Sequence, residues 1–256
     1  MLTEERYAAI LRLLDERKAA TVQELTELLN TSESTIRRDL NALHNLGRLN
    51  KVHGGATSIV SGYATKEDDV TVKYQLNAQE KQAIARHAAA LIRPNDFVFL
   101  DAGTTTEQMI DFIAEMSAVF VTDGIFLAKK LAKRGLTVFV PAGRIKAATE
   151  AVVGSETIDS LSRYNFTVGF FGTNGIAVRE GFTTPDVDEA RVKSEAMARC
   201  RRKIMLADAS KFGLVSSVSF AKLSDAEIIT NQLPDAQYRK HTKITEADPI
   251  DLHRNL

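Results

Sequence analysis

The 256-residue sequence has no tryptophan, one cysteine, no net charge and no long apolar stretch. A membrane span needs about 18 consecutive apolar residues, and the first residues also lack a signal-peptide pattern. The single cysteine, Cys200, excludes an internal disulfide and suits a reducing compartment. These absences exclude a membrane protein and a disulfide-stabilised secreted domain, and they predict a cytoplasmic protein.

Length and composition predict two domains. The chain is longer than a typical single domain of about 100–150 residues, and its 44% hydrophobic content is enough to bury a core. We place a small domain at residues 1–57, a linker at 58–75 and a larger domain at 76–256. The linker assignment follows from serine, glycine and acidic residues that show no sustained apolar period.

The segment that begins at Ser32 predicts an amphipathic helix ending near Gly47. Ser32 can cap a helix N-terminus, and three apolar residues then share one face at helical spacing: Ile36, Leu40 and Leu43. The opposite face is polar, with Thr35 and Arg37 on its flanks, and it carries Ser34, Arg38, Asn41 and Asn45. One face is therefore expected to be buried, while the other offers hydroxyl, guanidinium and amide groups.

Two earlier helices and a following strand complete a winged helix-turn-helix pattern. A first helix begins near Thr3, and Thr21 and Glu24 have the spacing of a capping box at the start of a second. Only residues 30–32 separate the second helix from the third, as in a helix-turn-helix. The stretch 48–52 then predicts a strand of a wing, closing at adjacent glycines where positive φ costs little.

The polar groups of the third helix and the wing match those that read duplex DNA. Arginine can donate two hydrogen bonds to guanine, asparagine can pair with adenine, and serine or threonine can serve either role. Basic wing residues suit phosphate oxygens, which position a protein without reading sequence. A helical bundle with a solvated arginine pair is the alternative, and it leaves the turn and the wing unexplained. The predicted DNA contacts are Ser34, Thr35, Arg37, Arg38, Asn41, Arg48, Lys51 and His53.

Charge balance predicts that DNA binding needs more than one copy of the chain. Lysine and arginine equal aspartate and glutamate over the whole sequence, and the first 57 residues are balanced as well. Affinity must then come from the local placement of charges and from two or more domains binding together, because linkage adds effective concentration. We therefore predict a homo-oligomer, a dimer or a tetramer.

Short apolar strands alternate with helices in the second part of the chain. A helix begins at Asn77, and the last strand is expected at 227–230. The other expected strands are 97–101, 119–122, 137–140, 166–171 and 204–207, with helices at 105–116, 125–134 and 188–201. This alternation predicts an α/β domain with a largely parallel sheet, in which ligands bind at the C-terminal ends of strands.

The first of these strand ends has a pattern suited to a phosphate. A buried strand leads directly into the run Asp101-Ala102-Gly103-Thr104-Thr105-Thr106 and then into a helix. Three hydroxyls and the first N–H groups of the helix would face one point, where a phosphate can bind. It is not a Walker loop, because no Gly-Lys-Ser/Thr follows. Taken alone, such a turn is more often an ordinary helix cap.

Other strand ends add further polar groups. The run 172–175 can form a concave set of backbone donors with an amide, although a plain turn explains it equally well. Lys211 can neutralise a phosphate or pair with Asp208, while the Asp123 carboxylate accepts from hydroxyls but repels phosphate. Glu189 and Lys193, spaced i, i+4, predict an ion pair on a helix surface. The predicted ligand-binding residues are Asp101, Gly103, Thr104, Thr105, Thr106, Thr122, Asp123, Gly172, Thr173, Asn174, Gly175 and Lys211.

Residues 3–57 resemble the N-terminal domain of the DeoR family of bacterial sugar-metabolism regulators, whose signature helix is similar to Ser34-Thr35-Ile36-Arg37-Arg38-Asp39-Leu40. The resemblance continues to about Thr230 through runs similar to 101–106, 171–175, 181–186 and 210–213. It implies a second domain that resembles ribose-phosphate isomerase and binds a sugar phosphate. Family members often carry asparagine where Asp123 stands. The most similar subgroup, repressors of fructose operons, implies fructose 1-phosphate as the effector, with tagatose or galactitol phosphates as alternatives.

The sequence as a whole predicts a ligand-controlled repressor rather than an enzyme. Its expected fold is an α+β winged helix-turn-helix domain followed by an α/β sugar-phosphate sensor domain. Its expected partners are double-stranded operator DNA, a phosphorylated sugar and further copies of the chain, and no membrane. An isomerase using Asp101, Asp208 and Lys211 is one alternative, since one scaffold hosts many functions, and a protein-interaction module is another. The sequence has no metal-ligand spacing, nucleophile elbow or dinucleotide motif, so no cofactor is expected.

Overall fold

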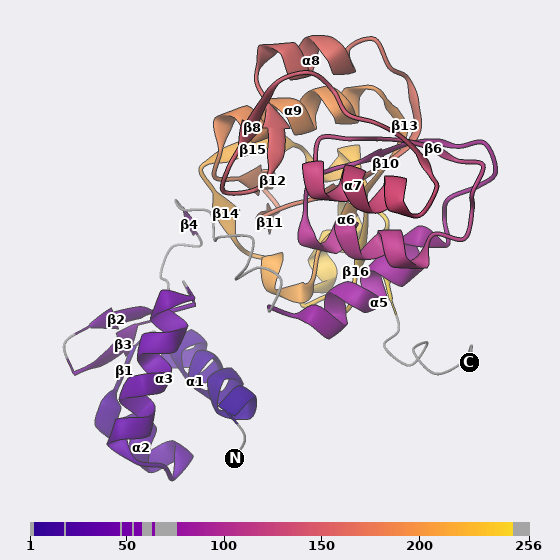
Figure 1. The fold of residues 1–256 in the computed structure, drawn as a ribbon. Helices are drawn as coiled ribbons and strands as arrows, with labels where there is room; N and C mark the ends of the chain where they lie inside the picture. The colour runs from indigo at the N-terminus through magenta and orange to yellow at the C-terminus, as the bar shows by residue number, and fades with distance from the viewer. Residues whose placement is uncertain are drawn as a thin grey trace. The chain divides into compact units, whose positions relative to one another are not determined.

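The computed structural model describes residues 3–17, 19–46, 48–52, 54–57, 63–64 and 76–247. The chain forms two compact units, Met1–Tyr63 and Ala64–Leu256 (Figure 1). The boundary lies within the proposed linker, most of which is outside the described residues. In the part of the chain that the structure describes, no helix is both long and apolar enough for a membrane span.

The first unit packs helices against a small antiparallel sheet with strand order β1-β3-β2. Its elements are α1 (Thr3–Arg17), β1 (Ala19–Thr21), α2 (Val22–Leu29), α3 (Glu33–Asn45), β2 (Asn50–Val52) and β3 (Gly55–Thr57). The core contains two or three buried apolar residues from each helix, among them Ile10, Leu14, Leu25, Ile36 and Leu40. This is the predicted winged helix-turn-helix, with β1 as an additional strand.

Local signals set the helix starts in this unit. The Thr21 hydroxyl accepts from the Glu24 N–H while the Glu24 carboxylate accepts from the Thr21 N–H, which is the predicted capping box. Ser32 caps α3, as predicted, by accepting from the N–H of Thr35. Gly55 allows β3 to approach β1, because a Cβ there would lie 2.4 Å from the carbonyl oxygen of Ala20.

The second unit is built on a seven-stranded parallel sheet, as the alternating pattern predicts. In sheet order the strands are β17 (Ile244–Glu246), β16 (Glu227–Thr230), β13 (Cys200–Leu206), β10 (Phe166–Gly172), β5 (Phe97–Leu100), β6 (Val119–Thr122) and β7 (Thr137–Phe139). The expectation that 227–230 is the last strand is wrong. β17 is a short edge strand that buries little apolar surface, so its sequence has no strong strand pattern.

Helices cover both faces of this sheet (Figure 1). They are α5 (Ala78–Ala89), α6 (Thr104–Met109), α7 (Ile125–Lys133), α8 (Ser155–Leu161) and α9 (Val187–Ala198), with 3₁₀ turns η1 (Ile110–Phe112), η2 (Ala209–Lys211), η3 (Leu223–Asp225) and η4 (Ala236–Lys240). On β5, Val98 and Leu100 face the cluster that contains α5, α6 and α7. Phe99 faces the cluster that contains α8 and α9. Alternate side chains of one strand thus enter two cores.

Several short elements flank the sheet and were not predicted. They are the hairpin β8 (Arg144–Lys146) and β9 (Ala151–Val153), the antiparallel strands β11 (Gly175–Ala177), β12 (Gly181–Thr184) and β15 (Val218–Ala221), and the two-residue strands β4 (Tyr63–Ala64) and β14 (Val215–Ser216). Two predicted helices are also too long. The one expected to reach residue 116 changes to 3₁₀ geometry after Met109, and the one expected to reach 201 ends at Ala198, because Cys200 already pairs with Phe166 in the sheet.

Candidate functional site

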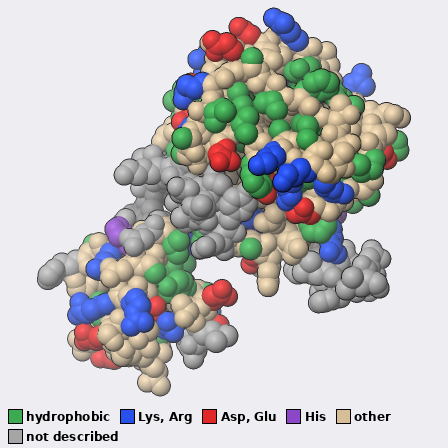
Figure 2. Space-filling model, viewed as in Figure 1, with side chains coloured by type: hydrophobic (Ala, Val, Ile, Leu, Met, Phe, Trp, Pro, Cys, Tyr) green, Lys and Arg blue, Asp and Glu red, His purple; other side chains and the backbone are tan. Residues whose placement is uncertain are grey.

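The exposed face of α3 carries the predicted DNA-reading groups. Ser34, Arg37, Arg38 and Asn41 are exposed, whereas the apolar residues on the opposite side are buried. In Figure 2 basic and acidic side chains both lie on the visible face of the first unit, in keeping with its balanced charge. The guanidinium groups of this helix therefore lie on a surface that carries both basic and acidic side chains.

Contacts within the first unit distinguish the predicted DNA-binding residues from one another. Thr35 is half-buried and its hydroxyl lies 2.9 Å from that of Ser32, so it belongs to the helix cap. Arg37 pairs with Glu33 at 3.0 Å in an exposed i, i+4 ion pair. The Lys51 ammonium donates to Asn41 Oδ1 at 2.7 Å, which joins the wing to α3. Arg48 is half-buried, and His53 lies outside the described residues.

A buried ion pair that sequence reasoning missed holds α3 in place. Asp39 lies within the signature run but is almost fully buried, and it accepts from Arg6 Nε and, at 3.2 Å, from Arg6 Nη2. This bidentate contact joins α1 to α3. The only signal in the sequence is an acidic residue next to the apolar face, which does not identify its partner.

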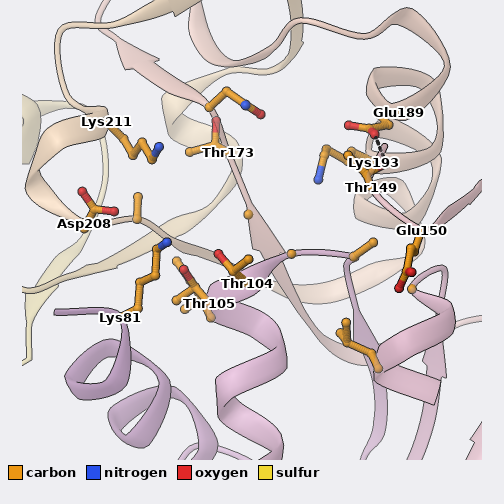
Figure 3. Close-up of a pocket in the computed structure, with 18 of the residues that line it drawn as sticks. Lys81, Thr104, Thr105, Thr149, Glu150, Thr173, Glu189, Lys193, Asp208 and Lys211 are labelled. Carbon is orange, nitrogen blue, oxygen red and sulfur yellow. Dashed lines mark hydrogen bonds between the residues drawn. The ribbon is translucent and has the colours of Figure 1, made fainter. Parts of the chain in front are cut away.

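A pocket in the second unit lies where β5, β10 and β13 end (Figure 3). Seven of the predicted ligand-binding residues line it: Gly103, Thr104, Thr105, Gly172, Thr173, Asn174 and Lys211. The carboxyl ends of parallel strands share one edge of the sheet, which brings these loops together although they are far apart in sequence. Asn174 Oδ1 accepts from Thr184 Oγ1 at 3.2 Å, so the amide is oriented by β12.

The other five predicted ligand-binding residues do not line this pocket. Asp101, Thr106, Thr122, Asp123 and Gly175 are buried, and the atoms expected to meet a ligand meet the loops instead. Thr106 Oγ1 donates toward the carbonyls of Asp101 and Gly103, at 2.6 and 2.8 Å. Thr122 Oγ1 accepts from the N–H of Gly124 at 3.1 Å.

The two aspartates hold neighbouring strand ends together. Asp101 Oδ2 accepts from the N–H of Gly172 at 2.8 Å, and Asp123 Oδ1 accepts from the N–H of Ala102 at 2.7 Å. At Gly175 a Cβ would lie 2.4 Å from the carbonyl oxygen of Leu214, so that glycine serves close packing. These groups position the pocket loops rather than face the pocket.

The expectation that Glu189 and Lys193 form an ion pair on a helix surface is wrong. Both side chains are buried and line the pocket, and Lys193 Nζ pairs with Asp101 Oδ2. Glu189 Oε1 instead accepts from Thr149 Oγ1 at 2.7 Å and from Lys146 Nζ at 2.9 Å. The two residues lie on the same side of α9 as buried Ala196, so the helical period of that side was the signal that placed them inward.

Burial and close charges determine the electrostatics of this region. Burial by itself lowers the pKa of Lys193, but the carboxylates of Asp101, Glu189 and Asp123 outweigh it and raise that pKa above the usual lysine range. Burial and the charge of Asp101 raise the pKa of Asp123 well above the usual aspartate range. The strand ends therefore hold the Lys193–Asp101 ion pair beside a second carboxyl group, that of Asp123, whose ionisation is disfavoured.

Replacing Asp123 by asparagine should raise thermal stability at neutral pH. Asparagine keeps an acceptor for the Ala102 N–H and removes a buried charge. Because the folded-state pKa of Asp123 is raised, its contribution to stability is full below the unfolded-state pKa of about 3.9 and is lost as pH rises through the folded-state pKa. The gain in Tm of Asp123→Asn should therefore increase from acid to neutral pH.

Differential scanning calorimetry of the full chain would measure this gain, and each kcal/mol corresponds to about 2–4 °C for a domain of this size. An exposed aspartate, Asp159, supplies the control variant Asp159→Asn. If Asp123→Asn is no more stable than the parent at neutral pH, the buried carboxyl group does not destabilise the folded state.

Sequence reasoning missed three more polar residues that line the pocket: Lys81, Thr149 and Glu150. Lys81 lies in the first turn of α5, and Asn77 ties the start of this helix to the loop after β13 through a 2.9 Å bond from its Nδ2 to Asp208 Oδ1. Thr149 and Glu150 lie in the turn of the β8–β9 hairpin. No local pattern indicates their placement, because it depends on contacts between distant segments.

Comparison with known proteins agrees with both units. Residues 6–61 match the DeoR-like helix-turn-helix domain, and residues 76–232 match the DeoR C-terminal sensor domain. The chain is 38% identical to a Bacillus subtilis (strain 168) protein named uncharacterized HTH-type transcriptional regulator FruR, over 96% of this chain and 97% of that protein. It is 32% identical to the lactose phosphotransferase system repressor of Streptococcus mutans, over 96% of this chain and 99% of that one.

Among solved structures, ribose 5-phosphate isomerase A of Methanocaldococcus jannaschii matches with a TM-score of 0.41 and 12% identity, over 53% of this chain and 55% of that one. The family matches carry the assignment, because together they cover most of the sequence and coincide with the helix-turn-helix and with the domain that holds the pocket. This chain belongs to the DeoR family of transcriptional regulators.

Proposed function

We propose that this protein represses a sugar-utilisation operon, that of fructose uptake in particular, and leaves its operator when a phosphorylated sugar such as fructose 1-phosphate binds. The observation that carries the proposal is the polar face of α3, on which Arg38 is exposed together with Ser34 and with Asn41, which Lys51 orients. A face of this kind on a helix-turn-helix suits the major groove. The similarity to a lactose phosphotransferase system repressor supports repression of a phosphotransferase operon.

The pocket of the second unit supplies the sensor in this proposal. Thr104 and Thr105 offer hydroxyls, the side-chain amide of Asn174 offers N–H groups, and Lys81 and Lys211 offer positive charge. Hydroxyls, N–H groups and ammoniums are the groups that bind phosphate oxygens. We assign fructose 1-phosphate as the effector because the sequence resembles repressors of fructose operons, and the similarity to the regulator named FruR supports this assignment. A regulator, rather than an isomerase, is the function that these names support.

The proposal places the protein in the cytoplasm as a homo-oligomer. Two recognition helices on one assembly gain affinity through effective concentration, which a domain of balanced charge needs. The sugar phosphate would favour an arrangement of the two recognition helices that fits the two halves of the operator less well. Linkage then requires the effect to be reciprocal. Operator DNA must weaken the binding of the sugar phosphate by the same factor by which the sugar phosphate weakens the binding of DNA.

A DNA-selection experiment tests the proposal. The purified full chain is incubated with random duplexes, bound DNA is sequenced, and the selected site is titrated with the chain and with Arg38→Ala. The loss of a bidentate contact to guanine should cost about 1–3 kcal/mol, or roughly tenfold to a hundredfold in affinity. Arg12→Ala is the matched control, because Arg12 is an exposed arginine of α1, outside the recognition face.

The same titration repeated with fructose 1-phosphate tests the sensor. Release of the selected DNA by this ligand, and not by fructose, is the expected result. Enrichment of no sequence, or equal affinities of the parent and Arg38→Ala, would contradict the role of α3. Release by no phosphorylated sugar would contradict the role of the pocket.

A further inference from the structure

The two ends of the pocket carry opposite charge. In Figure 3, Thr104 and Thr105 lie in the middle of the pocket, with Lys81, Lys211 and Asp208 on one side of them. Glu189 and Glu150 lie on the other side, next to Lys193 and Thr149. The first group comes from α5 and from the loop after β13, and the second comes from α9 and the β8–β9 hairpin. An elongated ligand that fills the pocket would therefore meet two chemically different ends.

The lysine end suits a phosphate. It has two ammoniums and one carboxylate, and Asp208 Oδ1 accepts from Asn77 Nδ2 at 2.9 Å and from the Ser210 N–H at 3.0 Å. A phosphate monoester carries about 1.5–2 negative charges at pH 7, so it is attracted to this end. The hydroxyls of Thr104 and Thr105 lie beside it and can donate to phosphate oxygens.

The opposite end has an excess of carboxylates. The Lys193 ammonium is paired with buried Asp101, and Lys146 is paired with Glu189 at 2.9 Å, so neither lysine leaves this end positive. Glu150 adds a further carboxylate that lines the pocket. The titratable side chains at or against this end are Asp101, Asp123, Glu150, Asp186, Glu189, Lys146 and Lys193.

A hydroxyl group of the protein itself already bonds to a carboxylate at this acidic end. Thr149 Oγ1 donates to Glu189 Oε1 at 2.7 Å, which shows the bond that a ligand hydroxyl could make there. A carboxylate accepts from hydroxyls but is repelled by a phosphate dianion. The acidic end thus favours an uncharged, hydroxyl-bearing part of a ligand and disfavours a second phosphate.

We propose that the pocket is polarised, so that it binds sugars phosphorylated at one end more tightly than it binds bisphosphates of the same sugar. The phosphate lies at Lys81 and Lys211, and the free hydroxyl end lies at Glu189 and Glu150. Glu189 and Glu150 are then the residues that determine specificity. This inference rests on the proposed sensor function and deepens it, since it names the class of ligand that releases the protein from DNA.

Calorimetric titration of the full chain with fructose 1-phosphate, fructose 1,6-bisphosphate and inorganic phosphate tests the proposal. The bisphosphate should bind about tenfold more weakly than the monophosphate, because its second phosphate meets like charge. Glu150→Gln and Glu189→Gln remove one charge each and retain side-chain length. Each should strengthen binding of the bisphosphate relative to the monophosphate. Glu156→Gln, at an exposed glutamate of α8 outside the pocket, is the control and should leave the ratio unchanged.

The outcomes separate this inference from the function on which it rests. Equal affinities for the monophosphate and the bisphosphate in the parent chain would overturn the polarised pocket while leaving a sugar-phosphate sensor. A ratio that stays the same in both glutamate variants would overturn the assignment of specificity to Glu150 and Glu189. If none of the three probes binds, the sensor function fails and the inference fails with it. Circular dichroism melting of each variant establishes that it is folded.

Discussion

Lys193→Met should lower the free energy of unfolding of the second unit by about 3–5 kcal/mol, the usual cost of removing one partner of a buried ion pair. Lys193 is 5% exposed and Asp101 is 1% exposed, so water cannot replace the lost ammonium. Asp101 also accepts from the Gly172 N–H, so its charge would remain where two strand ends meet. Urea unfolding of the full chain, followed by circular dichroism, would measure the loss.

The double variant Lys193→Met with Asp101→Asn is the matched control. It removes both charges and keeps an acceptor for the Gly172 N–H, and replacement of a whole buried ion pair by neutral residues is often close to neutral in stability. Most of the lost stability should therefore return. A single variant that loses less than about 1 kcal/mol, or a double variant that is no more stable than the single one, would show that the pair is not a buried ion pair in solution.

Leu40→Ala should destabilise the first unit by about 2–5 kcal/mol and abolish operator binding with it. Leu40 is 0% exposed and packs in the core beneath the recognition face of α3. A unit of this size has only a small core, so such a loss is a large fraction of its stability. Hydrogen exchange of the amides of α3 in the full chain would report the change, which should be an increase in rate confined to the first unit.

Leu28→Ala provides the comparison for this variant. Leu28 is 50% exposed on α2, and substitutions at such positions are usually within about 0.5 kcal/mol of neutral. Exchange rates in α3 and affinity for the selected DNA should be nearly unchanged. Similar losses in the two leucine variants would contradict the assignment of Leu40 to the core.

The winged helix-turn-helix could be predicted almost completely from its sequence. Thr21 and Glu24 form the expected capping box, Ser32 caps α3, and Ile36 and Leu40 are buried. Each of these features depends on residues within about four positions of one another, where helical geometry determines which groups meet. The strand β1 was missed because three residues carry too little pattern to be distinguished from a loop.

For the sensor domain, the parallel sheet and the position of the pocket at the strand ends could be predicted from the sequence. The residues that line the pocket could be predicted less well. Thr104 and Thr105 line the pocket while Thr106, next in the same run, turns its hydroxyl back to the carbonyls of its own loop. A run of like residues cannot show which hydroxyl faces outward, because this depends on where the helix begins and how the loop turns.

Local pattern thus settles the family, the main helices and parallel strands, and the polar face of α3, because these follow from spacing along one helix or strand. Contacts across the fold decide the rest. Asp101 and Lys193 are 92 residues apart and meet only because α9 packs beside the end of β5. Lys81 and Glu150 enter the pocket in the same way, from elements distant in sequence. The charge seen by a ligand is a sum over such neighbours, and a linear sequence does not specify which neighbours they are.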